Sequence, residues 1–378
     1  MTTRVPPLME ILAEVPDPRH KRGKRYPLNA MLTLTVVAVL CGYKTVKAIA
    51  EWGANYGEEY AARLGFNAHG YPAQASWYRV LRLVEVEVFE EKLRCWVEGL
   101  LKPEEGERLG ISIDGKTLRV SKKMRASNSH LLSAVVHEIG VVVGQRVVED
   151  HTNEIGMIQA LLLDLALEGR VVTTDGLLTQ KEVAETIVEE GGDYVLPVKD
   201  NHPATREAIA EWFAEAPAPY EEANQTAQRV EKGHDRLVTR RLETTTVLND
   251  YLDWQGVAQA FKLTRRFVHL STGEIQEQTL YGITSLSPEA ADAEALLTFI
   301  QQHWTIENKL HWVKDVTLDE DRCQLRIGRT HHLMALVRNL ALSLLRLTHH
   351  DNIASSLRTF AAQPHKALEL VAYPVGER

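Results

Sequence analysis

The spacing of apolar residues changes near residue 104, and this change constrains the fold more than any other feature of the chain. Before it, apolar side chains recur at helical spacing, which predicts a helical amino-terminal region. The predicted helices cover residues 8–12, 30–42, 43–52 and 76–101. A polar break at 103–107 then leads into segments whose composition and alternation are typical of strands. The chain therefore divides into a helical part and a part that contains a sheet.

The order of the segments after residue 107 restricts the topology of that sheet. Three strands are predicted at 109–114, 131–138 and 141–149, with a hairpin turn at Ile139-Gly140. Alternating helices and strands follow at 155–167, 171–174, 180–190, 194–198 and 204–214. Three strands, a helix, a strand, a helix and a strand is the order of a ribonuclease H-like α/β domain.

The rest of the chain predicts an insertion and a final helical region. Residues 220–286 are β-rich, with strands predicted at 242–247, 258–268 and 277–283. Helical spacing resumes at 290–316 and returns at 332–347 and 353–361. We therefore predict an α/β fold whose ribonuclease H-like core, a mixed sheet flanked by helices, is interrupted by the β-rich insertion. The predicted domains are 1–103 (helical and DNA-contacting), 104–219 (first part of the core), 220–286 (insertion) and 287–378 (closing helices).

Two aspartates end predicted strands, and each is followed by glycine. Asp114 stands in Ile-Ser-Ile-Asp-Gly-Lys and Asp175 in Val-Thr-Thr-Asp-Gly. In open α/β sheets ligands bind at the carboxyl ends of strands, and a following glycine lets the backbone turn and leaves the carboxylate uncovered. A single Asp-Gly pair most often only makes a turn. Two such pairs after two apolar strands favour a carboxylate site as much as they favour two turns.

Glu307 is the candidate for a third carboxylate. At helical spacing it shares a face with His303, Trp304 and His311, although a lone glutamate on a helix is most often a salt-bridge partner. Grouped carboxylates suit hard divalent cations such as magnesium or manganese. Such cations can activate a water or a 3′-hydroxyl and stabilise the leaving oxygen of a phosphoryl transfer.

Other metal sites fit the pattern less well. Zinc held by His303 and His311 would need both nitrogens about 2 Å from one ion. On an α-helix these residues lie roughly 12 Å apart along the axis. The acidic run at 315–321 lacks the central glycine and the ligand spacing of a calcium loop, so it predicts a solvated turn or a shell of acids near Glu307.

Longer motifs carry a resemblance to one family. They are Ile-Asp-Gly-Lys-Thr-Leu-Arg at 113–119, Asn-Glu-Ile at 153–155, Gly-Asp-Tyr-Val-Leu at 192–196 with Lys199 and Asn201, His-Trp at 303–304, Ile-Glu-Asn-Lys-Leu-His-Trp at 306–312, Asp-Val at 315–316 and Glu-Asp at 320–321. Pro-Asp-Pro-Arg at 16–19 and Arg-Tyr-Pro-Leu at 25–28 add to them. In these stretches the chain resembles the H-repeat-associated transposases of ISAs-type bacterial insertion sequences, a branch of the DDE transposases.

The resemblance implies that Asp114, Asp175 and Glu307 are the catalytic acids and the ligands of magnesium or manganese. It implies a ribonuclease H-like core with a β insertion before the glutamate helix, cleavage of DNA at the element ends and strand transfer to target DNA. We also expect a homodimer in the DNA complex. Two departures leave loop details near the site open: residues 176–180 read Gly-Leu-Leu-Thr-Gln instead of Ala-Met-Gly-Cys-Gln, and His202 replaces a glutamine.

DNA binding has to come from local basic segments, because the formal net charge is -8. Such segments are 19–25, 116–125, 229–241 and 265–266. Each alone is typical of a solvated surface, but together they fit a surface that follows DNA phosphates. Trp254 could stack on an unpaired base, although a place in the core of the insertion is favoured. The predicted DNA-contacting residues are Arg19, Lys21, Arg22, Lys24, Arg25, Lys116, Arg119, Lys122, Lys123, Lys199, Asn201, His234, Arg236, Trp254, His303 and Lys314.

The cysteines and the absence of targeting signals bear on the compartment. The cysteines are 3 in number, far apart and form no C-x-x-C pair, which favours a reducing interior over disulfides or a cysteine zinc site. We expect no signal peptide, and the apolar run at 30–42 is shorter than the about 20 residues that span a bilayer. The prediction is a cytoplasmic protein at the bacterial nucleoid, with double-stranded DNA and no membrane as its partner.

Two other functions remain open on the sequence. One is a metal-dependent nuclease on the same fold that cleaves DNA without joining it, which strand-transfer assays would distinguish. The other is a domesticated DNA-binding protein without catalysis. The three acids count against the second, since a binding protein has no need of convergent carboxylates.

Overall fold

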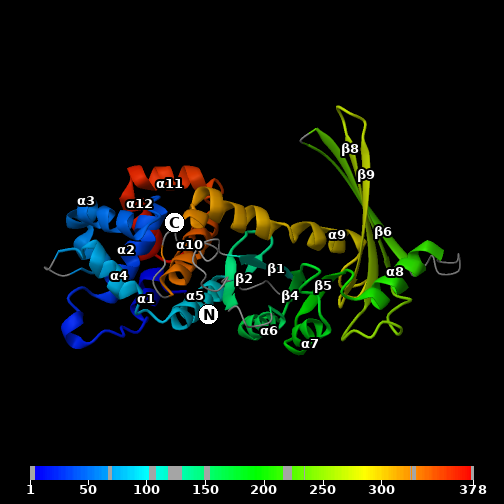
Figure 1. Ribbon diagram of the computed structural model, residues 1–378, viewed down its shortest axis with the longest axis horizontal. Helices are drawn as coiled ribbons and strands as arrows, with labels where there is room; N and C mark the ends of the chain where they lie inside the picture. Colours follow the sequence, from blue (N-terminus) through cyan, green and yellow to red (C-terminus); the bar gives the residue numbers. More distant parts are fainter. Residues whose placement is uncertain are drawn as a thin grey trace.

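The computed structural model is an elongated molecule with a helical end, a central sheet and a β arm (Figure 1). It describes residues 5–66, 70–101, 108–117, 130–148, 154–215, 224–233, 235–323, 325 and 329–375. In Figure 1 the amino-terminal helices, in blue and cyan, lie beside the carboxyl-terminal helices, in orange and red. These helices are α1 (Leu8–Ala13), α2 (Leu28–Leu40), α3 (Val46–Leu64), α4 (Gln74–Leu81), α5 (Val86–Leu100), α10 (Thr330–Leu347), α11 (Ile353–Ala362) and α12 (Pro364–Ala372).

Helix α2 is the centre of the helical end. It is apolar on all sides, and every residue except Asn29 is buried. Its neighbours are α1, α3, α10, α11 and α12, so both ends of the sequence fold around it. The predicted buried helix at 30–42 is therefore confirmed. In the part of the chain that the structure describes, no helix is both long and apolar enough to cross a bilayer.

Two helix boundaries differ from the prediction. The Thr45 hydroxyl accepts a hydrogen bond from the Ala48 N–H at 3.1 Å and caps the start of α3. That helix then continues past residue 52 to Leu64 and ends at Gly65, whose φ of 85° stops it. The segment predicted as one helix at 76–101 is divided into α4 and α5.

A single mixed sheet runs through the described residues from 109 to 284, in the order β3-β2-β1-β4-β5-β9-β8-β7-β6. Strand β4 is parallel to β1 and to β5, and the other neighbours are antiparallel. The strands are β1 (Leu109–Thr117), β2 (His130–Val136), β3 (Val142–Val148), β4 (Arg170–Thr174), β5 (Asp193–Val198), β6 (Asn224–Gly233), β7 (Arg236–Thr245), β8 (Gln259–His269) and β9 (Ile275–Thr284). The order of strands and helices predicted through residue 214 is confirmed, with α6 (Glu154–Asp164), α7 (Lys181–Glu189) and α8 (Pro203–Glu215) between the strands.

The strands of the predicted insertion extend this sheet. Strand β9 pairs with β5, with Leu196 opposite Ile283, so β6 to β9 continue the sheet from its β5 side. These four strands are long and form the arm that rises beyond α8 and α9 (Ala293–Gln302) in Figure 1. The β-rich character predicted for 220–286 is confirmed, and its strands are continuous with those of the core.

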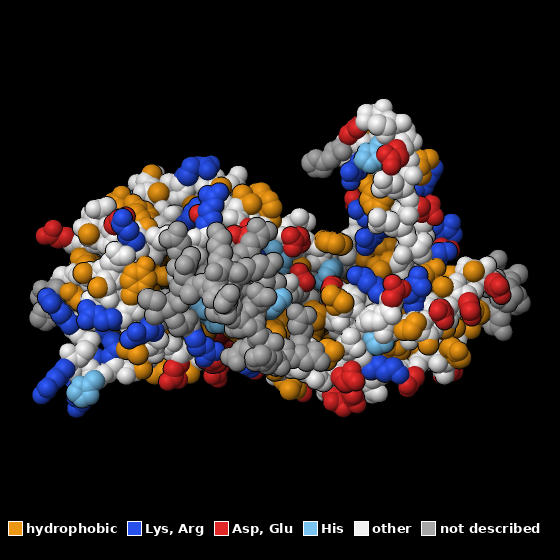
Figure 2. All heavy atoms as spheres, in the orientation of Figure 1, with side chains coloured by type: hydrophobic (Ala, Val, Ile, Leu, Met, Phe, Trp, Pro, Cys, Tyr) orange, Lys and Arg blue, Asp and Glu red, His pale blue; other side chains and the backbone are white. Residues whose placement is uncertain are grey.

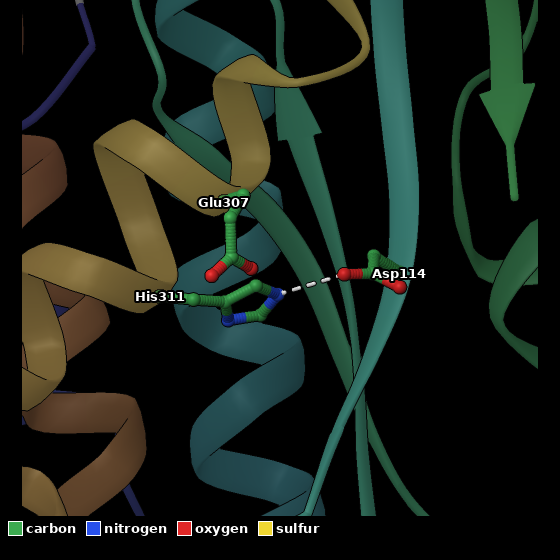
Figure 3. Close-up of side chains that lie close together, drawn as sticks. All are labelled: Asp114, Glu307 and His311. Atoms are coloured by element: carbon green, nitrogen blue, oxygen red, sulfur yellow. Dashed lines mark ion pairs between the residues drawn. The ribbon is translucent and has the colours of Figure 1, made fainter. Parts of the chain in front are cut away.

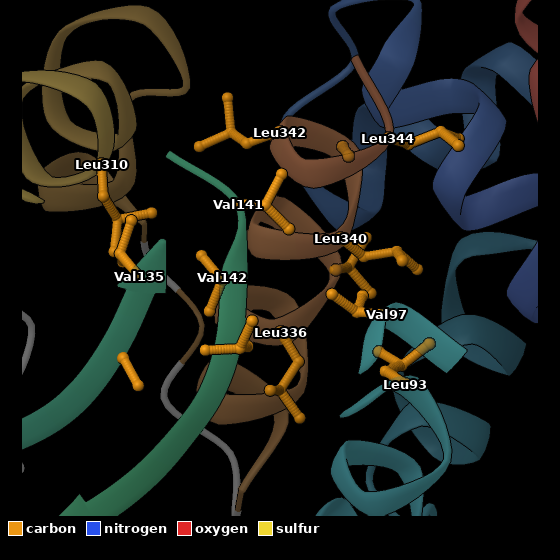
Figure 4. Close-up of a cluster of buried hydrophobic side chains, with 14 of the residues drawn as sticks. Leu93, Val97, Val135, Val141, Val142, Leu310, Leu336, Leu340, Leu342 and Leu344 are labelled. Atoms are coloured by element: carbon orange, nitrogen blue, oxygen red, sulfur yellow. The ribbon is translucent and has the colours of Figure 1, made fainter. Parts of the chain in front are cut away.

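Helices cover both faces of the sheet because successive strand residues point to opposite sides. Val171 joins an apolar cluster with Leu296 and Leu297 of α9, whereas the next residue, Val172, joins the main core with Ile158 of α6. Figure 1 shows α6 and α7 on one side of the strands and α9 on the other. The main core extends to the helical end, where side chains of α5, β3 and α10 meet (Figure 4). The sheet is thereby fixed to the helices.

Candidate metal centre and active-site cavity

Asp114 and Asp175 lie side by side on neighbouring parallel strands. Pairing of β1 with β4 ends with Ile113 opposite Thr174. The next residue along each segment is an aspartate, Asp114 in β1 and Asp175 directly after β4. The prediction that both aspartates end their strands is correct for Asp175 and wrong for Asp114. Strand β1 continues to Thr117, because β2 still pairs with it beyond Asp114 and holds Gly115 in the strand. On the side of β1 that faces β4, Asp114 has no strand neighbour, because β4 has ended at Thr174.

Glu307 and His311 come from a widened helix that follows α9. The helix predicted at 290–316 continues as a helical path, but it becomes a π-helix at Ile306–His311 and again at Val313–Thr317. π-Helical turns are rare and often mark functional sites. In Figure 3 the His311 ring reaches toward Asp114 on β1, and the Glu307 carboxylate lies beside that ring. One donor atom from each of Asp114, Glu307 and His311 lies within 4.8 Å of the others.

The two nitrogen atoms of the buried His311 ring lack hydrogen-bond partners among the described residues. Its Nε2 lies 3.3 Å from Oδ2 of Asp114, yet neither ring nitrogen makes a well-aligned hydrogen bond to a described residue. Burial by itself would raise the pKa of Asp114, but the His311 ring and the Gly115 N–H outweigh it, and the net pKa is lowered. Asp114 is therefore ionised near neutral pH. Two carboxylates and a buried imidazole without a hydrogen bond are a donor set that fits a divalent cation.

Asp175 lines the same cavity but is not one of the three clustered donors. Its Oδ1 accepts hydrogen bonds from the N–H groups of Leu177 and Leu178, at 3.1 and 3.0 Å, which fixes the turn after β4. No hydrogen bond of its Oδ2 to another described residue is found. The cavity that contains Asp114, Asp175 and Glu307 has a volume of about 320 Å³.

Buried polar contacts hold the start of the widened helix against the sheet. The His303 Nδ1 lies 2.9 Å from the Thr173 hydroxyl, and that hydroxyl lies 3.0 Å from Nε2 of His137. The Ser112 hydroxyl donates to the His303 carbonyl at 3.0 Å. Burial lowers the pKa of His303 despite the nearby Asp114 and Asp175. His303 is therefore neutral near pH 7, and its contacts with Thr173 and Ser112 fix the start of the widened helix against the sheet.

A buried ion cluster joins the two elements that carry the clustered donors. The Glu320 carboxylate is 3% exposed and lies 3.2 Å from Lys314, 3.3 Å from Lys116 and 3.5 Å from Arg338. Lys116 also pairs with Asp315. Lys116 is two residues after Asp114 on β1, and Lys314 follows His311 on the widened helix. The cluster therefore ties β1 to this helix close to the candidate metal centre.

The predicted DNA-contacting residues fall into distinct groups. Arg119, Lys122, Lys123 and His234 lie outside the described residues. The exposed members are Lys21, Arg22, Lys24, Arg25, Lys199, Asn201 and Arg236. Asn201 nonetheless uses its side-chain amide to donate to the carbonyls of Gly176 and Thr179.

Five of the predicted DNA-contacting side chains have partners within the protein. Lys314 is 1% exposed and paired with Glu320, and Lys116 is held in the same cluster. Arg19 is buried and bound to Asp17 and the Tyr26 carbonyl. Trp254 is buried and donates to the Thr205 hydroxyl at 3.1 Å, and His303 is bound to Thr173. Lys314, Lys116, Arg19 and Trp254 are thus engaged within the protein in this conformation, whereas His303 also lines the cavity.

The sequence interpretation named three residues of this region without giving them their observed surroundings. His311 had a usable signal, its position four residues after Glu307 on one helical face. Glu320 was interpreted as part of a solvated turn or of a shell of acids near Glu307, and Arg265, which lines the cavity, as part of a basic pair on a surface that follows DNA phosphates. Their surroundings come from segments far apart in the sequence.

Comparisons with known proteins agree with the cavity of converging acids. The family model described as "Transposase DDE domain" matches residues 105–344, and a model for a domain associated with it matches residues 9–97. The chain belongs to the DDE transposase family. Its relatives include the "H repeat-associated putative transposase YhhI" of Escherichia coli K12, 30% identical over 89% of this chain and 90% of the relative. Another is the "Putative transposase YncI" of Escherichia coli O157:H7, 31% identical over 90% of this chain and 87% of the relative. This DDE transposase is thus an insertion-sequence enzyme whose substrate is DNA, and its family implies a divalent metal.

Proposed function

We propose that the transposase cleaves DNA strands at the ends of its element and transfers them to target DNA by in-line phosphoryl transfer at the Asp114–Glu307 cavity. The observation that supports this most strongly is the convergence of Asp114, Glu307 and His311 within 4.8 Å, beside Asp175. A site made for binding alone has no use for ionised carboxylates where a DNA phosphate has to approach, because they repel it. The same carboxylates are useful where a cation offsets them.

Magnesium or manganese is the metal we propose for this cavity. Asp114 and Glu307 offer carboxylate oxygens, and Asp175 offers Oδ2 from the neighbouring strand end. His311 adds a nitrogen, which magnesium uses less readily than manganese does. When bound, such ions activate the attacking oxygen and stabilise the leaving oxygen. The residues themselves fix the position of the site: β1 and β4 hold the aspartates, and the widened helix holds Glu307 and His311.

The core is proposed to be of the ribonuclease H-like kind. The support is the observed sheet, in which an antiparallel β3-β2-β1 unit is followed by the parallel strands β4 and β5 with helices on both faces. We keep the predicted domain boundaries of 1–103, 104–219, 220–286 and 287–378 as part of this proposal. Helices α10, α11 and α12 of the last segment pack on the amino-terminal helices and form one helical body with them, whereas α9 packs on the sheet.

DNA is proposed to lie in the hollow between the helical body and the arm. Figure 2 shows this hollow, with Lys and Arg side chains gathered over the base of the arm. Exposed cations on the arm include Lys232, Arg236, Arg241 and Arg266. A second group of exposed cations lies at 21–25, at the end of the helical body away from the arm in Figure 1. We further propose a homodimer in the DNA complex, acting on nucleoid DNA in the cytoplasm.

The direct test is substitution of each acid. Asp114→Ala, Asp175→Ala and Glu307→Ala should each abolish metal-dependent cleavage of element-end DNA while thermal unfolding and DNA binding change little. Glu185→Ala, at an exposed position on α7, is the matched control and should cleave normally. Near wild-type cleavage by any one of the three variants would remove that residue from the site. Cleavage without strand transfer by the wild-type protein would instead favour the nuclease alternative.

A further inference from the structure

Arg265 enters the cavity from the arm. On β8 the residues Phe261, Leu263 and Arg265 share one face, because strand side chains alternate. Phe261 and Leu263 are fully buried, and Arg265 continues their line to the wall of the cavity. The next residue, Arg266, points to the other face and is exposed. One of these two adjacent arginines therefore reaches the carboxylate cavity and the other does not.

The Arg265 guanidinium has no acidic partner among the residues that the structure describes. Its Nε is buried without a hydrogen bond, and no ion pair links it to an acid among the residues with described positions. Arg240 lies directly opposite it on β7, an arrangement of like charges that destabilises a sheet. Burial, and secondarily Arg240, lower the pKa of Arg265. Arg240 itself is paired with Glu231 at 2.7 Å, so the missing partner is specific to Arg265.

A second cation reaches the same cavity. Lys199, directly after β5, lines it and has no ion pair within the described ranges. Its aliphatic chain crosses Gly176, where a Cβ atom would overlap it. The glycine after Asp175 thus makes room for Lys199. Two cations without an acidic partner among the described residues therefore share with three carboxylates a cavity that is otherwise largely apolar, where charge-assisted hydrogen bonds are strong.

We propose that Arg265, with Lys199 beside it, binds a phosphate of the DNA strand that enters the cavity. A guanidinium binds phosphate oxygens with parallel N–H donors, and a phosphate would supply the partner that Arg265 lacks. This role rests on the proposed function, because it assigns a place to the substrate of that reaction. It would also offset the repulsion between Arg265 and Arg240, which no acid of the described residues offsets at Arg265.

The test measures binding rather than catalysis. Element-end duplexes carrying single neutral methylphosphonates across the cleavage junction are titrated onto wild-type protein, with EDTA to exclude metal. One position should weaken binding about tenfold or more, as expected for one charge-assisted hydrogen bond. In Arg265→Met this position should lose its effect, whereas Arg266→Met should keep the wild-type pattern. Identical patterns in wild type and Arg265→Met would overturn the proposal.

Stability and cleavage separate this proposal from its alternatives. Arg265→Met keeps the bulk of the side chain and removes the charge opposite Arg240, so its Tm should be equal to or higher than that of the wild type. A clearly lower Tm would mean that Arg265 stabilises the arm, and would overturn the binding role. The proposed function is tested independently by wild-type cleavage with magnesium, which does not depend on the methylphosphonate result.

Discussion

Glu320→Gln should destabilise the fold strongly, although it changes one atom. The carboxylate is 3% exposed and offsets the charges of Lys116, Lys314 and Arg338. Burial tends to raise its pKa, but Lys314, Arg338 and Lys116 outweigh burial and hold the pKa at about 2, against an ordinary 4.5. That difference corresponds to about 3 kcal/mol at pH 7. Removing one partner of a buried ion pair costs about 3–5 kcal/mol of stability, which agrees with this value.

The pH dependence follows from the direction of the pKa change. A carboxyl group whose pKa is lowered by folding stabilises the protein above its unfolded pKa, and this stabilisation is lost as the pH falls toward the folded pKa. The difference in unfolding free energy between Glu320→Gln and the wild type should therefore reach its maximum at pH 7. Near pH 3 it should be less than half of that value. The assay is urea unfolding of both proteins across this range, with exposed Glu185→Gln as the control.

The double variant Glu320→Gln/Lys314→Met separates charge from packing. If uncompensated cations cause the loss, removing one of them should recover part of the unfolding free energy. A loss below about 0.5 kcal/mol for Glu320→Gln, the range of ordinary surface substitutions, would refute the role of the ion cluster. So would a further loss on adding Lys314→Met.

Three further predictions address the cavity and the DNA surface. His311→Ala should weaken manganese binding more than magnesium binding in calorimetric titrations, because it removes a nitrogen donor; equal losses would exclude His311 as a ligand. Gly176→Ala should slow DNA cleavage because its Cβ displaces Lys199, whereas Gly156→Ala, which meets open space, should not; equal cleavage rates would show that the Lys199 position is unimportant. Reversing the charges of the exposed loop should weaken binding to all DNA sequences alike and should flatten the dependence of affinity on salt concentration. An unchanged dependence on salt would place DNA elsewhere. The loop residues to reverse are Lys21, Arg22, Lys24 and Arg25.

The strands and their order through residue 198 were predictable because alternation and apolar runs are local signals. Strand β6 (Asn224–Gly233) was not predicted, because it is polar and mostly exposed and so lacks an apolar pattern. Asp175 at the end of β4 followed from the same pattern. The position of Asp114 inside β1 did not, because Asp-Gly usually turns, and here Gly115 stays in the strand only through its pairing with β2. That pairing depends on residues 130–136, which are distant in the sequence. The pattern around Asp114 alone therefore does not show that strand pairing will prevent a turn.

The chemical surroundings of individual side chains were the least predictable part. Residues 306–317 carry the apolar spacing of an α-helix. The change to π-helical hydrogen bonding alters that spacing too little for the sequence pattern to reveal it. Lys314 reads as a solvated lysine beside an acid, but its burial depends on Glu320 and on Arg338 of α10. Charge runs identify candidate DNA contacts, and only the tertiary fold separates the exposed cations from the buried ones.

The most direct test of the central proposal, metal-dependent phosphoryl transfer in the Asp114 cavity, is a change of metal specificity at Asp114. Asp114→Cys replaces a hard oxygen ligand with a softer sulfur, which magnesium binds poorly and manganese accepts better. Cleavage of element-end DNA by this variant should be lost in magnesium and should return by about tenfold or more in manganese. The wild type should cleave with either ion. Wild-type rates for Asp114→Cys in magnesium would contradict the account, because they would show that Asp114 holds no ion during the reaction.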